Sequence, residues 1–170
     1  MRDRHRPQPS AAGARYRPRM ALVSFALDVD CPASAERTWQ ALIDWRGHAT
    51  WIPRTTVRIL QGDGGVGTSF VARSGIGPLA FDDTMDVTLL DGATRTAAVR
   101  KTGPLLTGTA GFTVSERGAA SRIHWHEDVH VPGVPSLLAP ALAVGGRVMF
   151  RIAIRRLARR LLATPDPTAR

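Results

Sequence analysis

The chain has 170 residues, 44% of them hydrophobic, which is enough for one domain with a sizeable core and too short for two. Its formal net charge is +9. Residues 1–20 carry six arginines and one aspartate, residues 147–170 carry seven arginines and one aspartate, and residues 21–146 carry ten basic and twelve acidic residues. Because the positive charge is confined to the two ends, we expect no nucleic-acid partner.

Both ends of the chain are predicted to lie outside the folded domain. Residues 1–20 are rich in proline and arginine and lack the apolar segment of a secretory signal, so we expect a disordered basic tail. Met20 is an alternative start, which leaves open whether residues 1–19 are translated. The expected domain covers residues 21–163, and a flexible tail covers 164–170.

The cysteine content and the hydropathy pattern bear on the compartment. The single cysteine, Cys31, excludes an intrachain disulfide and favours a reducing environment, so we expect a cytoplasmic protein. All basic residues except Lys101 are arginine, which we interpret as the bias of a GC-rich genome. No run approaches the roughly 18 apolar residues that a membrane span requires.

The chain begins with a strand and short helices. Residues 22–30 alternate apolar and polar side chains, which predicts a half-buried strand. Residues 33–44 change to helical spacing. The linker 45–54 is expected to add one helical turn, with Trp45 and Trp51 closing one end of the core.

Six strand-like runs follow, separated by short turns rich in glycine. They cover residues 56–61, 68–74, 78–90, 94–101, 105–116 and 121–131. Short connections favour antiparallel neighbours. A helix from Ser136 or Pro140 to Leu162 is expected last, and it is the longest in the chain. Together these elements predict an α+β domain, in which a curved seven-stranded antiparallel sheet packs against the C-terminal helix.

The two halves of the final helix differ in pattern. Residues 137–150 are apolar all round, so both the sheet-facing side and the flanks are expected to be dry. Beyond Arg147 the pattern becomes amphipathic, with an apolar stripe that comprises Phe150, Ile154, Leu157 and Leu161. The basic residues of the helix are Arg147, Arg151, Arg155, Arg156, Arg159 and Arg160. They predict a solvated face or, alternatively, attraction to an anionic membrane; RNA is disfavoured because that face has no aromatic residue for stacking.

Two motifs match functional patterns without the required context. GDGGVG at 62–67 fits the glycine pattern of dinucleotide-binding loops, but a strand follows it where a helix is needed, so we predict a hairpin turn. His124, His126, Asp128 and His130 share one face of the last strand, a spacing compatible with zinc. Because this face is predicted to look into water, we expect no metal site, and we expect no cofactor.

Two carboxylates stand alone on strand faces that are otherwise apolar. Glu127 shares its face with Ile123, Trp125, Val129 and Val131. Asp83 shares its face with Leu79, Phe81, Met85, Val87 and Leu89. A buried, unpaired carboxylate is costly, so each needs a partner, water or a ligand. Pairing with an internal arginine, such as Arg73, Arg95 or Arg147, stays open beside the alternative of an apolar pocket with a few polar groups.

The order of elements resembles the START-like superfamily, also called SRPBCC or helix-grip, and in particular its bacterial polyketide cyclase/dehydrase and lipid-transport members. VDCPASAERTWQALIDW at 29–45 is similar to the opening strand and helix of that family. GVGTSF, GTAGFTV and SRIHWHEDV are similar to its third, sixth and seventh strands. The similarity spans about residues 22–162 and is specific for the fold.

The resemblance implies that the sheet grips the C-terminal helix and leaves a cavity for a lipid, polyketide or isoprenoid-like molecule. The expected ligand-binding residues are Phe70, Phe81, Asp83, Met85, Phe112, Trp125, Glu127 and Leu142. Glu127 and Asp83 are also the candidate catalytic residues of an alternative function, a polyketide aromatase/cyclase or dehydratase. No catalytic signature identifies an enzyme. A peripheral membrane lipid-exchange protein is a second alternative, and the oligomeric state stays open.

Overall fold

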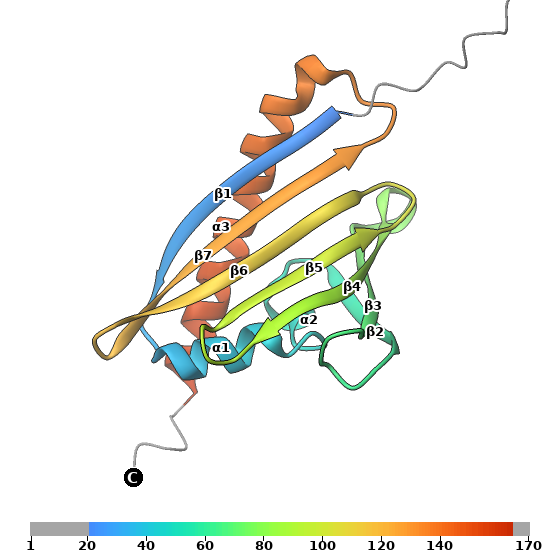
Figure 1. The fold of residues 1–170 in the computed structure, drawn as a ribbon. Helices are drawn as coiled ribbons and strands as arrows, with labels where there is room; N and C mark the ends of the chain where they lie inside the picture. Colours follow the sequence, from blue (N-terminus) through green and yellow to red (C-terminus); the bar gives the residue numbers. More distant parts are fainter. Residues whose placement is uncertain (1–20, 165–170) are drawn as a thin grey trace, which may run out of the picture.

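The computed structural model describes residues 21–164 and shows a seven-stranded antiparallel sheet that curves against a long C-terminal helix (Figure 1). The strands are β1 (Ala21–Cys31), β2 (Thr55–Gln61), β3 (Ser69–Ser74), β4 (Phe81–Asp91), β5 (Thr96–Thr102), β6 (Thr107–Arg117) and β7 (Ala120–Val131). Their order in the sheet is β1-β7-β6-β5-β4-β3-β2. The predicted α+β fold is confirmed, whereas the tails predicted at 1–20 and 164–170 lie outside the described residues except for Thr164.

The helices follow the predicted order. They are α1 (Ala35–Ile43), α2 (His48–Trp51) and α3 (Ala139–Ala163), with short 3₁₀ turns η1 (Gly77–Leu79) and η2 (Ser136–Leu138). The hydroxyl of Ser34 caps α1 by accepting a hydrogen bond from the backbone N–H of Arg37. The short helices expected after the first strand are therefore confirmed, and η2 adds one turn in front of the predicted long helix.

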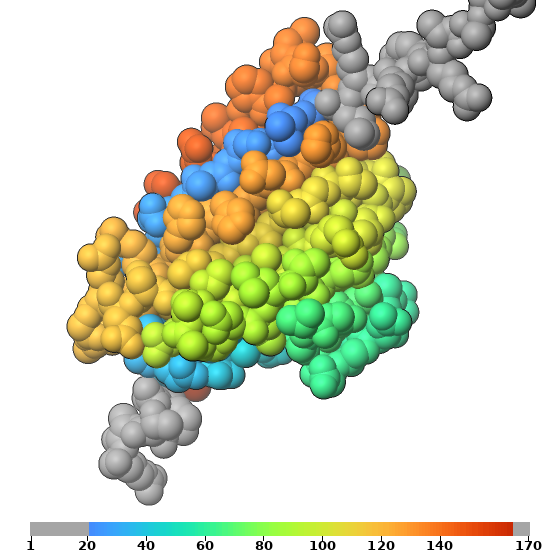
Figure 2. Space-filling model, viewed as in Figure 1, coloured from blue at the N-terminus to red at the C-terminus, as the bar shows by residue number. Residues whose placement is uncertain are grey.

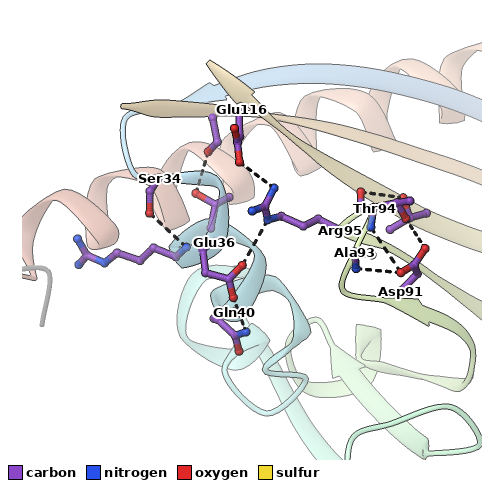
Figure 3. A network of polar contacts seen from close by, with 12 residues as sticks. Ser34, Glu36, Gln40, Asp91, Ala93, Thr94, Arg95 and Glu116 are labelled. Carbon is purple, nitrogen blue, oxygen red and sulfur yellow. Dashed lines mark hydrogen bonds and ion pairs between the residues drawn. The ribbon is translucent and has the colours of Figure 1, made fainter. Parts of the chain in front are cut away.

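Arg95, at the end of the turn between β4 and β5, ties α1 to the sheet (Figure 3). Its guanidinium donates to Glu36 of α1 at 3.3 Å and to Glu116 of β6 at 3.2 Å. Asp91 closes the same turn by accepting from the hydroxyl of Thr94 at 2.7 Å. Because Arg95 is engaged at this rim, it does not pair with the carboxylates inside the sheet.

Aromatic side chains fill much of the interior on the concave side of the sheet. Trp45 stacks on Phe70 with ring centroids 5.3 Å apart, and Trp125 stacks on Phe150 of α3 at 4.7 Å. Phe112 stacks on the other side of Trp125 at 5.6 Å. Both tryptophans predicted to close the core, Trp45 and Trp51, are buried, which confirms that prediction.

The apolar face predicted for residues 78–90 is wrong at both ends. Leu79 lies in η1 with 85% of its surface exposed, because β4 begins only at Phe81. A register shift between Val87 and Leu89 then turns Leu90 toward the core and leaves Leu89 exposed. One extra residue in a strand moves every later side chain to the opposite face.

Only the second half of α3 is well covered by the sheet. Its buried residues are Ala153, Ile154, Leu157 and Ala158, and Phe150 and Leu161 pack against them, so the predicted apolar stripe is confirmed. The expectation that the first half is dry all round is wrong, since Leu137 and Val144 are exposed. This half projects past the edge strand β1 (Figure 2), and many of its apolar side chains are exposed.

The neighbouring glycines of α3, Gly145 and Gly146, provide a matched test of this packing. A Cβ at Gly145 would meet no atom within 4 Å, so Gly145→Ala should raise the free energy of unfolding by about 1 kcal/mol through helix propensity. A Cβ at Gly146 would lie 2.6 Å from Cε1 of Phe25, so Gly146→Ala should instead lower it by about 1–3 kcal/mol. Urea unfolding measures both, and equal stabilities would contradict the close approach of α3 to β1.

Candidate functional site

A cavity of about 600 Å³ lies between the concave face of the sheet and α3. Its walls are mostly apolar, and its volume falls in the range of small-molecule sites. All eight residues that the sequence predicted as ligand-binding line it: Phe70, Phe81, Asp83, Met85, Phe112, Trp125, Glu127 and Leu142. Their role in binding stays a prediction, but the structure brings them together around one space.

Three charged side chains form a cluster in the wall of this cavity. Lys101 Nζ lies 2.5 Å from Oδ2 of Asp83 and 3.6 Å from Oε2 of Glu127. Less than a tenth of each side chain is exposed. The indole N–H of Trp125 donates to Oε1 of Glu127 at 3.2 Å. One ammonium is thus shared by two carboxylates in surroundings that are otherwise apolar.

The strand register explains how side chains from three strands meet. Met85 of β4 pairs with Lys101 of β5, so Asp83 is the diagonal neighbour of Lys101 on the same face. Strand β6 separates Lys101 from β7, and it places Gly108 opposite Lys101 and Ala110 opposite Glu127. Since these two residues carry no side chain or a single methyl, the path across β6 is open to the long lysine side chain.

Gly108 is also required by the backbone. It has a φ of +136°, and a Cβ there would lie 2.1 Å from the carbonyl oxygen of Asp128. No side chain fits in that space, so a glycine at this position preserves both the pairing of β6 with β7 and the passage for Lys101.

Burial and charge set the protonation of the cluster. Burial opposes the charge of Lys101, but the carboxylates of Glu127 and Asp83 outweigh it and raise the pKa of the lysine above 10.5. Burial also raises the pKa of Glu127 above 4.5, and the attraction of Lys101 offsets this only in part. Lys101 is therefore a stable cation, and Glu127 holds a proton more readily than a carboxyl in water does.

The raised pKa of Glu127 has a defined effect on stability. Protonation of this carboxyl favours the folded state, so its contribution is fully present below the unfolded-state pKa of about 4.5 and is lost as the pH rises through the folded-state value. At neutral pH the charge of Lys101 offsets the cost of burying the two carboxylates.

One oxygen of the cluster has no partner. Oδ1 of Asp83 is buried and accepts no hydrogen bond from the described residues, whereas Oδ2 of the same carboxylate is bound to Lys101. A buried acceptor left unpaired costs about 1–3 kcal/mol. Asp83, a residue of the cavity wall, therefore keeps one acceptor without a partner among the described residues.

Comparisons with known proteins agree with the architecture. The family model described as polyketide cyclase / dehydrase and lipid transport matches residues 23–162. The chain belongs to this family. Its fold is the helix-grip fold, and family and fold together make it a START-like (SRPBCC) ligand-binding protein. A search of curated proteins finds no match.

Solved structures of low sequence identity share the fold of this polyketide cyclase/dehydrase and lipid-transport family member. Norcoclaurine synthase from Thalictrum flavum in complex with dopamine and hydroxybenzaldehyde has a TM-score of 0.66 and 16% identity, over 96% of this chain and 99% of that one. A point mutant of the same enzyme with a transition-state analogue has a TM-score of 0.62 and 19% identity, over 85% and 98%. Ara h 8.0201 has a TM-score of 0.64 and 15% identity, over 85% and 100%.

Lys101 is the charged cavity residue of this family member that the sequence analysis missed. The prediction that an arginine pairs with the acids is wrong: Arg73 pairs with Asp82 at 3.0 Å, and Arg147 donates to the backbone oxygen of Ala26. Lys101 lies two residues beyond the buried Val99 and four beyond the buried Ala97 on the same strand face. The alternation of the strand could therefore have predicted that its side chain points inward. Its being the single lysine of the chain was a second signal.

Two other motifs lie where the sequence predicted. His124 is exposed and its Nδ1 lies 3.1 Å from Asp28, and His126 and His130 share its outward face of β7, away from the cavity. The GDGGVG segment forms the turn between β2 and β3, with positive φ at Gly62, Gly64 and Gly67.

A buried histidine is a further polar group in the wall of the cavity. His48 of α2 lines it, and its Nε2 lies 2.7 Å from the backbone oxygen of Leu42. Burial lowers the pKa of His48 to about 4, despite the opposing effects of that contact and of Asp44. The imidazole is therefore neutral at physiological pH and donates to Leu42.

Replacement of Lys101 tests the cluster directly. Lys101→Met leaves two buried carboxylates without a cation, so the free energy of unfolding at neutral pH should fall by about 3–5 kcal/mol. The loss should shrink as the pH is lowered, because Glu127, whose pKa is raised by burial, then takes up a proton and one buried charge is removed. Urea unfolding at neutral and mildly acidic pH measures both effects.

The neighbouring Arg100 is the matched control. It is exposed on the outer face and lies 3.5 Å from Asp86, so Arg100→Met should cost less than about 1 kcal/mol at every pH. A loss at Lys101 that equals the loss at Arg100, or one that does not depend on pH, would contradict the buried cluster.

Proposed function

We propose that this protein binds an amphipathic small molecule, a lipid, polyketide or isoprenoid-like compound, in the cavity between the sheet and α3. The single observation that carries the proposal is the free, buried oxygen Oδ1 of Asp83 in the wall of a 600 Å³ apolar space. A ligand that fills the space with apolar surface and offers one hydrogen-bond donor to Asp83 matches both features.

The surroundings of the free oxygen favour a neutral donor. Both carboxylates already share the ammonium of Lys101, so Asp83 Oδ1 lacks only a hydrogen-bond donor, and a second cation would bring a further costly charge into the interior. A hydroxyl or phenol donates one hydrogen bond to Asp83 without adding charge to the interior. We therefore infer that the preferred ligand carries a hydroxyl group on a flat or elongated apolar body.

The walls support an aromatic ligand in particular. Phe70, Phe112, Trp125 and Phe150 line the cavity, and their stacked rings offer flat apolar surfaces. Norcoclaurine synthase, which shares the fold, has been solved in complex with dopamine and hydroxybenzaldehyde, two aromatic compounds that carry hydroxyl groups. The likeness to that enzyme supports the fold, and the inference for this chain depends on its own cavity.

Replacement of Asp83 tests the proposed contact. Wild-type protein should bind a hydroxylated aromatic polyketide roughly tenfold more tightly than its methyl ether, because the ether has no donor for Asp83. Asp83→Asn places an amide where the free acceptor stood and should remove most of this preference. Tryptophan fluorescence or calorimetric titration measures the four affinities.

The adjacent Asp82 gives the control for this experiment. It lies on the outer face, half exposed, and pairs with Arg73, so Asp82→Asn should keep the wild-type preference. Equal affinity of the wild type for the phenol and the ether, or a failure to bind any fatty acid, isoprenoid quinone or aromatic polyketide, would refute the proposal.

A second candidate function is catalysis of a cyclisation or dehydration. The observation that favours it is a buried ion pair in the cavity wall. The ammonium of Lys101 is a proton donor, and the Asp83 carboxylate beside it keeps one oxygen, Oδ1, without a partner among the described residues. The ammonium is suited to polarise a ligand carbonyl, and the carboxylate to accept a proton. Product formed from a polyketide in the titration samples, and absent with Asp83→Asn, would favour this function over binding alone.

A further inference from the structure

The outward face of α3 exposes apolar side chains that the proposed function does not explain. By length and composition residues Ser136–Ala163 suffice to span a membrane, contrary to the sequence expectation, and only 17% of their most apolar stretch is buried. A core helix of a soluble domain is mostly buried, so this helix is unusual. Four of the exposed apolar residues of this segment, Leu137, Val144, Val148 and Ile152, follow helical spacing along one stripe.

The same face becomes basic toward the C-terminal end. Arg155 and Arg159 continue the line of Val148 and Ile152 at the next turns of the helix, and Arg151 lies beside it. Residues 136–164 contain six arginines and no acidic residue. Within residues 21–164 none of these arginines is paired with a carboxylate; Arg147 and Arg160 donate to backbone oxygens. The face therefore combines exposed apolar surface with unneutralised positive charge.

We propose that this face of α3 docks the protein onto an anionic lipid bilayer. The apolar stripe enters the boundary between headgroups and acyl chains, and the arginines contact lipid phosphates. The helix does not cross the bilayer, because Ala153, Ile154 and Leu157 pack it against the sheet. The docking is independent of which ligand the cavity binds.

A second copy of the chain fits this face poorly. A parallel pairing of two α3 helices would set arginines against arginines, and an antiparallel pairing would press Arg155 and Arg159 onto the apolar stripe of the partner. Either arrangement buries positive charge without an opposite charge. The tails supply little to neutralise it, since Asp3 and Asp166 are their sole acidic residues. An anionic bilayer offers both the apolar layer and the negative charge.

Exposed apolar side chains in two turns support the same orientation. Ile76 and Leu79 lie between β3 and β4, and Leu105 lies between β5 and β6. These turns are at the same end of the sheet as the connection from β7 to α3 (Figure 1). Gly75 and Leu106, next to them in the chain, line the cavity. Docking through this end turns the cavity toward the bilayer.

The test is sedimentation of the full chain with phosphatidylcholine vesicles that contain or lack phosphatidylglycerol. Binding is expected only to the anionic vesicles, and it should weaken as salt rises and screens the arginines. Arg151→Gln with Arg155→Gln should weaken it about fivefold for each arginine, whereas Arg58→Gln, an exposed arginine of β2, should leave it unchanged.

The apolar stripe is tested separately. Val144→Ser with Val148→Ser should weaken binding to anionic vesicles by roughly tenfold, because the inserted apolar surface is lost. Leu60→Ser removes a similarly exposed apolar side chain from β2 and should have no effect. Circular dichroism checks that each variant is folded.

Three results would overturn the proposal. The first is absence of binding to either vesicle. The second is binding to anionic vesicles that survives both the valine and the arginine pairs of substitutions, which would assign it to another surface. The third is a dimer in sedimentation equilibrium that Val144→Ser with Val148→Ser dissociates, which would assign this face to a second copy of the chain.

Discussion

The ammonium of Lys101, held between two carboxylates inside an apolar cavity, is the interaction on which the rest of the structure depends. A buried ion cluster is weak support for stability, since apolar residues of the same volume often serve the fold as well. Breaking such a cluster is nevertheless severe, because it leaves charge in the interior without a partner. The buried ion cluster lies in the wall of the cavity. A costly cluster and an unfilled space are both unfavourable for stability, and both are suited to binding a ligand.

The arrangement of strands allows this cluster to exist. Asp83, Lys101 and Glu127 come from three strands. Strand β6 lies between Lys101 and Glu127, and its residues beside them, Gly108 and Ala110, are small enough to let the two side chains meet. The sheet curves toward α3 (Figure 1), and the three side chains are buried in the wall of the cavity between them, where water screens their charges little. The glycine and alanine of β6 are thus as much a part of the site as the charged residues.

Period-two alternation predicted the inward direction of Asp83 and Glu127. The order of elements predicted the fold, and the resemblance to the family implied the cavity. The partner of the acids was not predicted, because alternation places a side chain on a face but does not show which strands meet across it. Lys101 shares a strand face with buried residues, but it is the last residue of the predicted strand 94–101, and a charged residue at a strand end is usually exposed. The bulge at Val87–Leu89 and the exposure of Leu79 and Val144 depend on strand length and covering elements, which no local pattern records.

The most direct test of the buried cluster is NMR of the lysine side-chain nitrogen, because Lys101 is the chain's single lysine and gives a single signal. The structure predicts one ammonium signal that is protected from exchange at neutral pH and stays protonated above pH 10.5. Its shift should move when a hydroxylated ligand enters the cavity. A neutral amine below that pH, or an ammonium that exchanges as fast as one in solvent, would contradict the account.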